Sequence, residues 1–520
     1  MEVFNIKNLS FSYNGAEEKA LNEISLRVNE GEMLLIIGES GCGKTTLLKM
    51  LKKELTPRGK LDGEILFMGG PLEKLTPRES AEKIGYLMQE TDFQLVTDRV
   101  YSELAFGPES LGVSKEIIRA RVAEFASCFG LSELFSREVN TLSGGQKQLL
   151  NLASVMLTGP GVIILDEPLS QLDPISSVEF INTVRRINRE LGTTVIIAEH
   201  HLEEVFSLAD RVVYMENGRI ADIGRPGEIC SRLADKRIGL TLPAPARVFN
   251  GLRLSGSAPL TVKEGRELLR NHSFSDCAEA SYNSNKEITL RAKNLFFRYE
   301  KNGSDVLRGL DFSAAKGAIY AVAGENGSGK STLLRLLSGE LRAYRGKVEN
   351  KNRTAYLPQN PRDAFVRDSL KDDFSEINNS YLELCERFGI VELLNRHPYD
   401  LSGGELQRAA IVKCLLTSPE VLLLDEPTKG LDSFSKRGLG ELLREIAAGG
   451  VTVVIVTHDL EFAACYSDHC GLLFDGLIIS QLPSRRFFRE NTFYTTVAVR
   501  MSRGILDGAV TADDIIKRAL

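Results

Sequence analysis

The chain contains two copies of one sequence pattern, and this repeat limits the possible folds more than any other feature. The stretch 11–51 matches 297–337 at an offset of 286 residues, and the stretch 141–174 matches 400–433 at an offset of 259 residues. The second copy is therefore 27 residues shorter between the two blocks. A repeat of this length predicts two related domains in one chain.

The repeat divides the 520 residues into four predicted segments. They are a first domain at 1–234, a connector at 235–286, a second domain at 287–481 and a C-terminal tail at 482–520. Pro, Ser and Gly are frequent in the connector, which is typical of loops. Within it, Thr261 and Glu264 have capping-box spacing before an apolar-periodic run, so we expect one short helix there.

The composition indicates a globular protein without a strong electrostatic field. Hydrophobic residues make up 43% and charged residues 26%, and the net charge is −6. This charge excludes binding of nucleic acid or an anionic membrane by overall charge alone. The eight cysteines show no C-x-x-C spacing, which argues against a zinc or redox motif. The N-terminus lacks a signal-peptide pattern, and apolar runs such as 33–38 are too short to span a bilayer.

Each copy contains the phosphate-loop pattern G-x-x-x-x-G-K-[ST] between an apolar run and a helix-like run. Backbone N–H groups of such a loop bind phosphates, with help from the helix N-terminus. The lysines would contact the β- and γ-phosphates, and Thr45 and Ser331 would bind Mg²⁺. A glycine-rich turn with an incidental lysine is the alternative, and two matches at equivalent places disfavour it. The predicted nucleotide contacts are Gly38, Glu39, Ser40, Gly41, Cys42, Gly43, Lys44, Thr45 and Thr46 in the first copy and Gly324, Glu325, Asn326, Gly327, Ser328, Gly329, Lys330, Ser331 and Thr332 in the second.

Aliphatic residues followed by Asp-Glu-Pro form a second matching feature. A buried strand that ends in Asp is how phosphate-loop folds hold their metal, so Asp166 and Asp425 are the predicted metal carboxylates. Glu167 and Glu426 would polarise the attacking water as general bases. The alternative is that these acids only end a strand. Repetition with Pro at the same spacing disfavours that alternative.

A Ser-Gly-Gly sequence precedes a long helix-like run in each copy, as LSGGQ (142–146) and LSGGE (401–405). Such a helix start suits an anion, although an ordinary serine N-cap also explains the serine. Together with the phosphate loops and the Asp-Glu strands, these sequences resemble the ATP-binding cassette (ABC) family. The resemblance implies an α/β fold with two tandem P-loop ABC nucleotide-binding domains. Each would have a RecA-like α/β core, a β subdomain and an α-helical signature subdomain.

The resemblance also implies how ATP and Mg²⁺, the expected cofactors, are held. Cassettes of this family pair head to tail, so each ATP would lie between one phosphate loop and the opposite signature. The implied signature contacts are Ser143, Gly144, Gly145 and Gln146 in the first copy and Ser402, Gly403, Gly404 and Glu405 in the second. Glu405 departs from the usual glutamine, which puts equal turnover at the two sites in doubt.

Three further roles follow from the resemblance, each on equivalent residues of both copies. They are the metal-binding glutamines Gln89 and Gln359, the catalytic histidines His200 and His458 that sense the γ-phosphate, and the adenine-stacking tyrosines Tyr13 and Tyr299. A position in the core is the alternative for the two tyrosines. Since each copy keeps both its glutamate and its histidine, we expect both sites to hydrolyse ATP.

The cassette motifs predict ATP hydrolysis but do not identify the task that it drives. The segment 89–112 resembles the ATPases of energy-coupling factor (ECF) transporters, the cobalt and vitamin uptake group, in which FGPE-x-LG recurs. The alternative is that 106–108 is an ordinary helix-ending turn. The second copy lacks this phrase at 359–374. The shorter second copy also predicts that the two domains contact their membrane partner through different grooves.

The ECF resemblance implies a peripheral protein on the cytoplasmic face of a prokaryotic cell membrane. Its partners would be integral membrane subunits, namely a transmembrane coupling subunit and a substrate-binding subunit, with no direct contact to nucleic acid. Two alternatives stay open: the tandem ATPase of a sugar importer, and a soluble ABC ATPase that acts on ribosomes or nucleic acid. The mixed charge of the connector disfavours the second of these.

Overall fold

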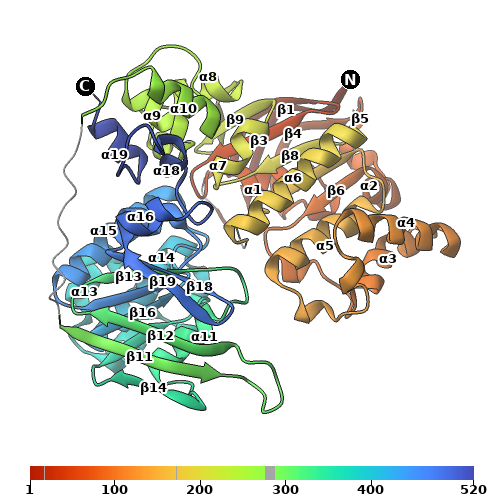
Figure 1. Ribbon diagram of the computed structural model, residues 1–520. Coiled ribbons are helices and arrows are strands. Elements are labelled where there is room, and N and C mark those ends of the chain that lie inside the picture. Colours follow the sequence, from red (N-terminus) through yellow and green to blue (C-terminus); the bar gives the residue numbers. More distant parts are fainter. Residues whose placement is uncertain (17, 171, 276–286, 520) are drawn as a thin grey trace. The chain divides into compact units, whose positions relative to one another are not determined.

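The computed structural model describes residues 1–16, 18–170, 172–275 and 287–519. These residues form two compact units, unit 1 (Met1–Thr261) and unit 2 (Val262–Leu520), and Figure 1 labels most of their elements. The division falls inside the predicted connector 235–286.

Unit 1 contains an antiparallel sheet and a mainly parallel sheet. The antiparallel sheet has the order β2-β1-β4-β5, and the six-stranded sheet has the order β10-β9-β3-β8-β7-β6. The strands are β1 (Glu2–Tyr13), β2 (Leu21–Asn29), β3 (Met33–Gly38), β4 (Gly59–Phe67), β5 (Gly70–Pro71), β6 (Ile84–Leu87), β7 (Val162–Asp166), β8 (Thr194–Ala198), β9 (Arg211–Glu216) and β10 (Arg219–Gly224). The helices are α1 (Lys44–Met50), α2 (Pro77–Lys83), α3 (Val100–Ser110), α4 (Lys115–Cys128), α5 (Gly144–Met156), α6 (Pro174–Leu191), α7 (Leu202–Val205), α8 (Pro226–Arg232) and α9 (Ala244–Gly251).

Unit 2 repeats this arrangement. Its antiparallel sheet has the order β12-β11-β14, and its six-stranded sheet has the order β15-β16-β17-β13-β18-β19. The strands are β11 (Ile288–Phe297), β12 (Leu307–Ala315), β13 (Ile319–Ala323), β14 (Arg345–Asn350), β15 (Thr354–Leu357), β16 (Val421–Asp425), β17 (Thr452–Val456), β18 (His469–Phe474) and β19 (Leu477–Pro483). The helices are α10 (Val262–Arg270), α11 (Lys330–Ser338), α12 (Leu370–Ile377), α13 (Tyr381–Arg387), α14 (Gly403–Leu416), α15 (Ser433–Ala448), α16 (Leu460–Tyr466), α17 (Ser484–Glu490), α18 (Val497–Ser502) and α19 (Ala512–Lys517).

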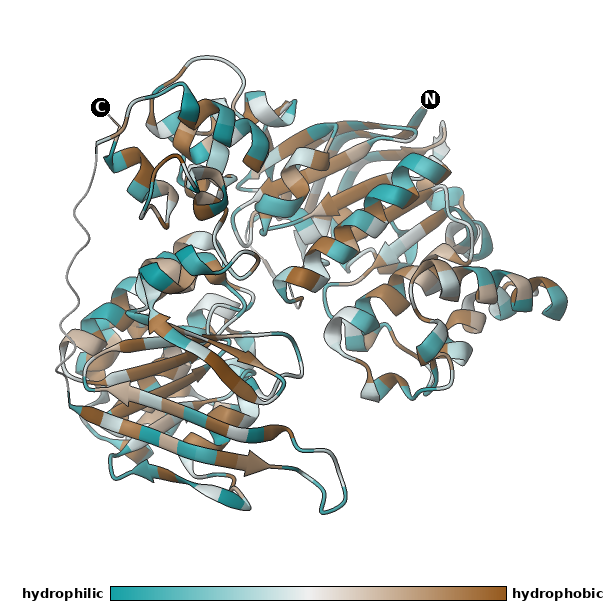
Figure 2. Ribbon diagram, viewed as in Figure 1, coloured by the Kyte–Doolittle hydropathy of each residue, from teal (hydrophilic) through white to brown (hydrophobic). Residues whose placement is uncertain are grey.

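Helices cover both faces of the parallel sheets, which explains why the central strands are apolar throughout. In β16, Val421 and Leu423 belong to the core that contains Leu333 of α11. Leu422 and Leu424, which alternate with them, belong to the core that contains helix α15. A parallel sheet buried on both faces has near-continuous apolar strands, visible as brown arrows in Figure 2. The predicted α/β class with two tandem units is confirmed.

The residues missing from the second copy map to two places. Unit 1 has β5 and α2 between β4 and β6, whereas three residues, 351–353, join β14 to β15 in unit 2. The helices before the signature are also shorter, because α3 and α4 have 11 and 14 residues and α12 and α13 have 8 and 7. The two units therefore differ both between their first sheet and the glutamine strand and in the helices before the signature.

The connector does not behave as one linker. The helix that the capping-box spacing predicted is present as α10, and it packs against α18 near the end of the chain. Arg266 of α10 donates hydrogen bonds to the carbonyl oxygens of Arg500, Met501 and Arg503. Since these partners are over 230 residues away in the sequence, local composition indicated a loop while tertiary contacts attach α10 to unit 2. Residues 276–286 of the predicted connector lie outside the described residues.

Candidate active sites

The predicted catalytic residues of unit 1 meet at one edge of its parallel sheet. The phosphate loop follows β3, Asp166 ends β7, His200 follows β8, and Gln89 follows β6. These four strands are neighbours in the order β3-β8-β7-β6. Because the carboxyl ends of parallel strands lie at the same edge, residues from distant parts of the sequence form one site.

The phosphate loop of unit 1 surrounds the ammonium group of Lys44. Lys44 Nζ donates to the carbonyl oxygens of Gly38 at 2.8 Å and Glu39 at 3.0 Å. Gly43 has a φ of 102°, and a Cβ atom on it would lie 2.6 Å from the carbonyl oxygen of Ala20. Glycine is therefore required there by both backbone conformation and space.

The phosphate loop of unit 2 has the same geometry. Lys330 Nζ donates to the carbonyl oxygens of Gly324 at 2.9 Å and Glu325 at 2.8 Å, and Gly329 has a φ of 103°. In each unit the loop leads into a helix whose first residue is the lysine. This arrangement fits the phosphates of a nucleotide. The other predicted contacts in these loops, between β3 and α1 and between β13 and α11, are Ser40, Gly41, Cys42, Asn326, Gly327 and Ser328.

The carboxylate predicted to face the metal in unit 1 is oriented by two hydroxyl groups. Thr45 Oγ1 donates to Asp166 Oδ1 at 3.0 Å, and the Tyr86 hydroxyl donates to Asp166 Oδ2 at 3.1 Å. Burial raises the pKa of Asp166, and the hydrogen bond from Thr45 opposes this rise. Sequence reasoning missed Tyr86, although a tyrosine precedes the glutamine by three residues in both copies.

The equivalent carboxylate of unit 2 has an unused acceptor atom. The Tyr356 hydroxyl donates to Asp425 Oδ2 at 3.4 Å. Among the described residues, Asp425 Oδ1 is buried without a hydrogen-bond partner, and Ser331 and Gln359 line the same groove. A buried carboxylate oxygen without a donor, beside a hydroxyl and an amide, fits a hard cation such as Mg²⁺.

Glu167 of unit 1 lies between the predicted histidine and glutamine. His200 Nε2 lies 2.9 Å from Glu167 Oε1, and Gln89 Nε2 donates to Glu167 Oε2 at 2.8 Å. Burial alone would raise the pKa of Glu167, but the hydrogen bond and charge of His200 hold it below its usual value. Glu167 thus favours the ionised form that a general base requires.

Glu426 of unit 2 has a different set of partners. His458 Nε2 lies 2.8 Å from Glu426 Oε1, and the backbone N–H of His458 donates to Glu426 Oε2 at 3.2 Å. Both glutamates have a left-handed backbone, with φ of 47° at Glu167 and 51° at Glu426. Such strain in a non-glycine residue is often found at catalytic sites. Gln359 lines the groove of unit 2.

The signature serines begin long helices in both units. Ser143 caps α5 by accepting from the Gln146 backbone at 3.3 Å, and Ser402 precedes α14 with its hydroxyl 2.8 Å from Glu405. In this structure the serines therefore make the contacts of ordinary helix starts. These contacts are compatible with the predicted role of the serines in binding ATP. The predicted glycines Gly144, Gly145, Gly403 and Gly404 form the first turns of these helices. Pairing of each signature with the opposite phosphate loop stays a prediction.

The two tyrosines predicted to stack on adenine are exposed. Tyr13 is 42% exposed and Tyr299 is 59% exposed, which contradicts the alternative that they are core residues. Their hydroxyl groups lie 2.9 Å from Thr46 Oγ1 and 3.0 Å from Thr332 Oγ1, respectively. Each tyrosine therefore lies beside the start of the helix that follows its phosphate loop, and it is exposed enough to contact a ligand.

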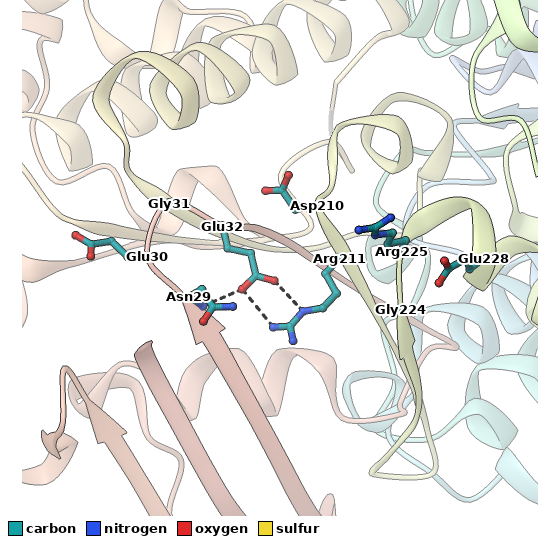
Figure 3. Close-up of a pocket in the computed structure, with 9 residues that line it drawn as sticks. All are labelled: Asn29, Glu30, Gly31, Glu32, Asp210, Arg211, Gly224, Arg225 and Glu228. Carbon is teal, nitrogen blue, oxygen red and sulfur yellow. Dashed lines mark hydrogen bonds and ion pairs between the residues drawn. The ribbon is translucent and has the colours of Figure 1, made fainter. Parts of the chain in front are cut away.

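Two cavities differ in their relation to these sites. In unit 2, a groove of about 990 Å³ contains Asp425, Gln359, Tyr356 and Lys413. In unit 1, a cavity of about 540 Å³ lies at the amino ends of β3 and β9, where Glu32 binds Arg211 (Figure 3). That cavity is at the opposite edge of the sheet from the phosphate loop and takes no part in the predicted site.

The described residues contain neither a cluster of metal-binding side chains nor a helix that could span a membrane. Residues 1–16, 18–170, 172–275 and 287–519 contain no cluster of three or more His, Cys, Asp or Glu side chains suited to a metal ion. The predicted Mg²⁺ sites have one carboxylate each and do not depend on such a cluster. None of the helices in these ranges has the length and apolar character needed to span a bilayer.

Comparisons with known proteins identify relatives along nearly the whole chain. The family model described as ABC transporter matches residues 21–170 and 307–429. A Bacillus anthracis protein with the provisional name ABC transporter ATP-binding protein is 42% identical, covering 98% of this chain and 97% of its own length. A Methanosarcina acetivorans protein with the same provisional name is 32% identical, covering 94% of this chain and 86% of its own length.

A solved structure that matches most of the chain shows the same fold. It is a complex of an archaeal ribosomal stalk protein with an archaeal ribosome recycling factor. The matched chain has a TM-score of 0.62 and 23% identity, covering 93% of this chain and 91% of that chain. At this identity the likeness shows the fold alone. The duplicated phosphate loops, Asp-Glu strands and signatures, with the family match in both copies, show that the chain belongs to the ABC transporter family as a two-cassette ABC ATPase.

Proposed function

We propose that this protein is the ATP-hydrolysing subunit of an ECF-type importer. It would power uptake of a vitamin, a metal ion or a similar micronutrient through separate membrane subunits. Two composite ATP sites would form at a head-to-tail interface between the cassettes. The provisional names of the relatives support a role in transport.

The residues of unit 1 give the chemistry of one such site. ATP bound with Mg²⁺ would supply the reactive γ-phosphoryl group. Lys44 would bind the phosphates, and Thr45 with Asp166 would hold the metal side. Glu167 would accept a proton from the attacking water, while His200 keeps the carboxylate ionised and oriented. Closing of the cassette pair would be the conformational change that is transmitted to the membrane subunits.

Exposed apolar side chains after Gln89 carry the proposal of a membrane-protein partner. Phe93 is 78% exposed, Val96 is 65% exposed and Phe106 is 44% exposed. All three lie in the segment 89–112 that resembles ECF ATPases. Phe106 and the two following residues lie inside α3, which continues to Ser110, so they are not a helix-ending turn. An apolar surface beside the active site suits a helix of a partner protein.

Unit 2 presents a different surface at the equivalent place. Val366 is 82% exposed, Ile377 lines the groove of about 990 Å³, and α12 is shorter than α3. This difference supports contact with one asymmetric membrane subunit through non-equivalent grooves.

Affinity purification from detergent-solubilised membranes tests the proposal. The tagged chain should recover small integral membrane proteins. Phe93→Ser combined with Val96→Ser should lower recovery about tenfold, equal to about 1.4 kcal/mol of lost binding. Leu191→Ser is the matched control, since Leu191 is 62% exposed at the end of α6. Recovery of ribosomes, or of a sugar permease, would contradict the ECF assignment and favour one of the two alternatives.

Single glutamate variants test the assignment of the bases. Because both units keep the glutamate–histidine pair, Glu167→Gln and Glu426→Gln should each lower the ATPase rate by half or more. Full activity in either variant would show that the corresponding glutamate is not a working base.

A further inference from the structure

Glu199 is a buried carboxyl group beside the unit 1 site that neither the motifs nor the resemblance identified. It lies directly after β8 and is 1% exposed. Its Oε1 accepts the backbone N–H of Leu169 at 2.8 Å. Its Oε2 accepts the backbone N–H groups of His200 at 2.7 Å and His201 at 3.0 Å.

These three hydrogen bonds connect two turns that matter for hydrolysis. Leu169 lies in the turn that follows Glu167 and leads to α6, and His200 is the residue whose imidazole contacts Glu167. One side chain therefore bridges the turn after the catalytic glutamate and the turn with the histidine. The bond to Leu169 joins segments that are 30 residues apart in the sequence.

Burial of the Glu199 carboxyl group is unfavourable, so packing alone does not explain its position. Burial raises its pKa to about 8, although the hydrogen bonds from His201, Leu169 and His200 oppose that rise. A buried carboxyl group destabilises a fold unless its hydrogen bonds are satisfied. Three backbone donors satisfy Glu199, and all three belong to the two turns of the site.

In unit 2, different residues connect the two equivalent turns. Thr457 directly precedes His458, as Glu199 precedes His200, and Thr428 lies two residues after Glu426, as Leu169 follows Glu167. The two threonine hydroxyl groups lie 3.2 Å apart, and Thr457 Oγ1 accepts the backbone N–H of Asp459.

The catalytic glutamate has different contacts in the two units, which carry Glu199 or Thr457 before the histidine. In unit 2 the backbone N–H of His458 donates to Glu426 Oε2. In unit 1 the N–H of His200 donates to Glu199, and Glu167 Oε2 accepts from Gln89 instead. The presence of a glutamate or a threonine before the histidine thus decides whether the base is bound by the backbone or by the glutamine.

We propose that Glu199 is a positioning residue of the unit 1 site, which ties the turn after Glu167 to the His200 turn and leaves Glu167 to Gln89. The two ATP sites of the chain are then held by different networks. This inference rests on the proposed assignment of Glu167 and Glu426 as the catalytic bases.

Steady-state ATPase assays of the full chain test this role. Glu199→Thr removes the bridge without supplying the threonine partner, so kcat should fall between about twofold and tenfold, with a change in KM for ATP below about twofold. Adding Leu169→Thr recreates the Thr428–Thr457 pair in unit 1 and should restore at least half of the lost kcat. Hydrogen exchange should be faster at the amides of residues 169 and 200 in Glu199→Thr, and slower again at the His200 amide in the double variant.

Glu32→Gln is the matched control, because Glu32 is a buried glutamate that accepts a backbone N–H from Asn29 at the opposite sheet edge (Figure 3). It should leave kcat unchanged. The inference is overturned if Glu199→Thr retains full kcat, or if Leu169→Thr restores neither kcat nor amide protection. The Glu167→Gln variant separates the two proposals. Full ATPase activity in Glu167→Gln refutes the assignment of Glu167 as the base. If Glu167→Gln loses activity but Glu199→Thr keeps the full kcat, only the role of Glu199 is refuted.

Discussion

A buried ion pair in unit 2 allows a quantitative test of the structure. Asp373 of α12 is 3% exposed and lies 2.5 Å from Lys413 Nζ of α14. Asp373 Oδ2 also accepts the backbone N–H groups of Val366 at 3.2 Å and Arg367 at 3.1 Å. Lys413 Nζ donates to the carbonyl oxygen of Ala364 at 2.6 Å. The aspartate therefore satisfies three donors, while the lysine has a second partner.

This difference predicts unequal costs for removing the two partners. Asp373→Ala leaves a buried ammonium group and two backbone N–H groups without their acceptor, which should cost about 3–5 kcal/mol. Lys413→Met keeps most of the stem volume and leaves the carboxylate with its two N–H donors, so about 1–2 kcal/mol should be lost. In unit 1, Glu103 likewise accepts the N–H groups of Val96 and Thr97. Ser154 stands at the position equivalent to Lys413.

Differential scanning calorimetry of the full chain measures both variants. With about 2–4 °C per kcal/mol for a domain of this size, Asp373→Ala should lower the Tm of unit 2 by about 6–20 °C, and Lys413→Met by about 2–8 °C. Arg387→Met is the control, because the Arg387–Glu445 pair is 48% and 60% exposed and contributes below about 1 kcal/mol. If Asp373→Ala proved no more destabilising than Lys413→Met, the number of donors that each group satisfies would not determine the cost of its removal.

Three further predictions concern unit 1. Because the pKa of Glu199 is raised in the folded state, its contribution to stability is complete below its unfolded pKa near 4.5 and is lost as the pH rises toward about 8. Thermal unfolding should therefore show a smaller fall in Tm between pH 5 and 8 for Glu199→Gln than for the parent chain. Equal falls in Tm would contradict the raised pKa. Tyr86→Phe removes a hydrogen bond to Asp166 and should raise the Mg²⁺ concentration for half-maximal ATPase activity up to about tenfold, which a Mg²⁺ titration measures; an unchanged titration would show that Tyr86 does not orient this carboxylate. Gly43→Ala should weaken ATP binding more than Gly41→Ala, since both glycines have positive φ but only the new Cβ at position 43 would lie 2.6 Å from Ala20 O, and equal binding of a fluorescent ATP analogue by the two variants would refute the steric argument.

Much of the fold and site was predictable from sequence because the deciding patterns are local. Phosphate loops such as Gly38 to Thr45 have fixed internal spacing, and the aliphatic run before Asp166 identifies a buried strand. Repetition of both patterns made a chance match improbable. The α/β class and the two-cassette family were therefore correct, and the roles of individual site residues remain predictions that the geometry supports.

Other features depend on contacts between distant segments, and local patterns do not identify the partners in these contacts. Tyr86 reaches Asp166 because β6 and β7 are neighbours, although 80 residues separate the two in the chain. Likewise, α10 joins unit 2 because Arg266 finds carbonyl acceptors near residue 501, so that a Pro-, Ser- and Gly-rich stretch divides between the units.

The sequence by itself determined that this chain has two cassettes, because phosphate-binding loops and metal-binding strand ends need particular residues at particular spacings. Only the tertiary structure decided how each predicted catalytic glutamate is held. Glu199 and Thr457 follow equally apolar strands, and neither belongs to a motif. Their effect depends on which backbone N–H groups the neighbouring strands bring within hydrogen-bond distance, because a buried donor or acceptor without a partner costs free energy.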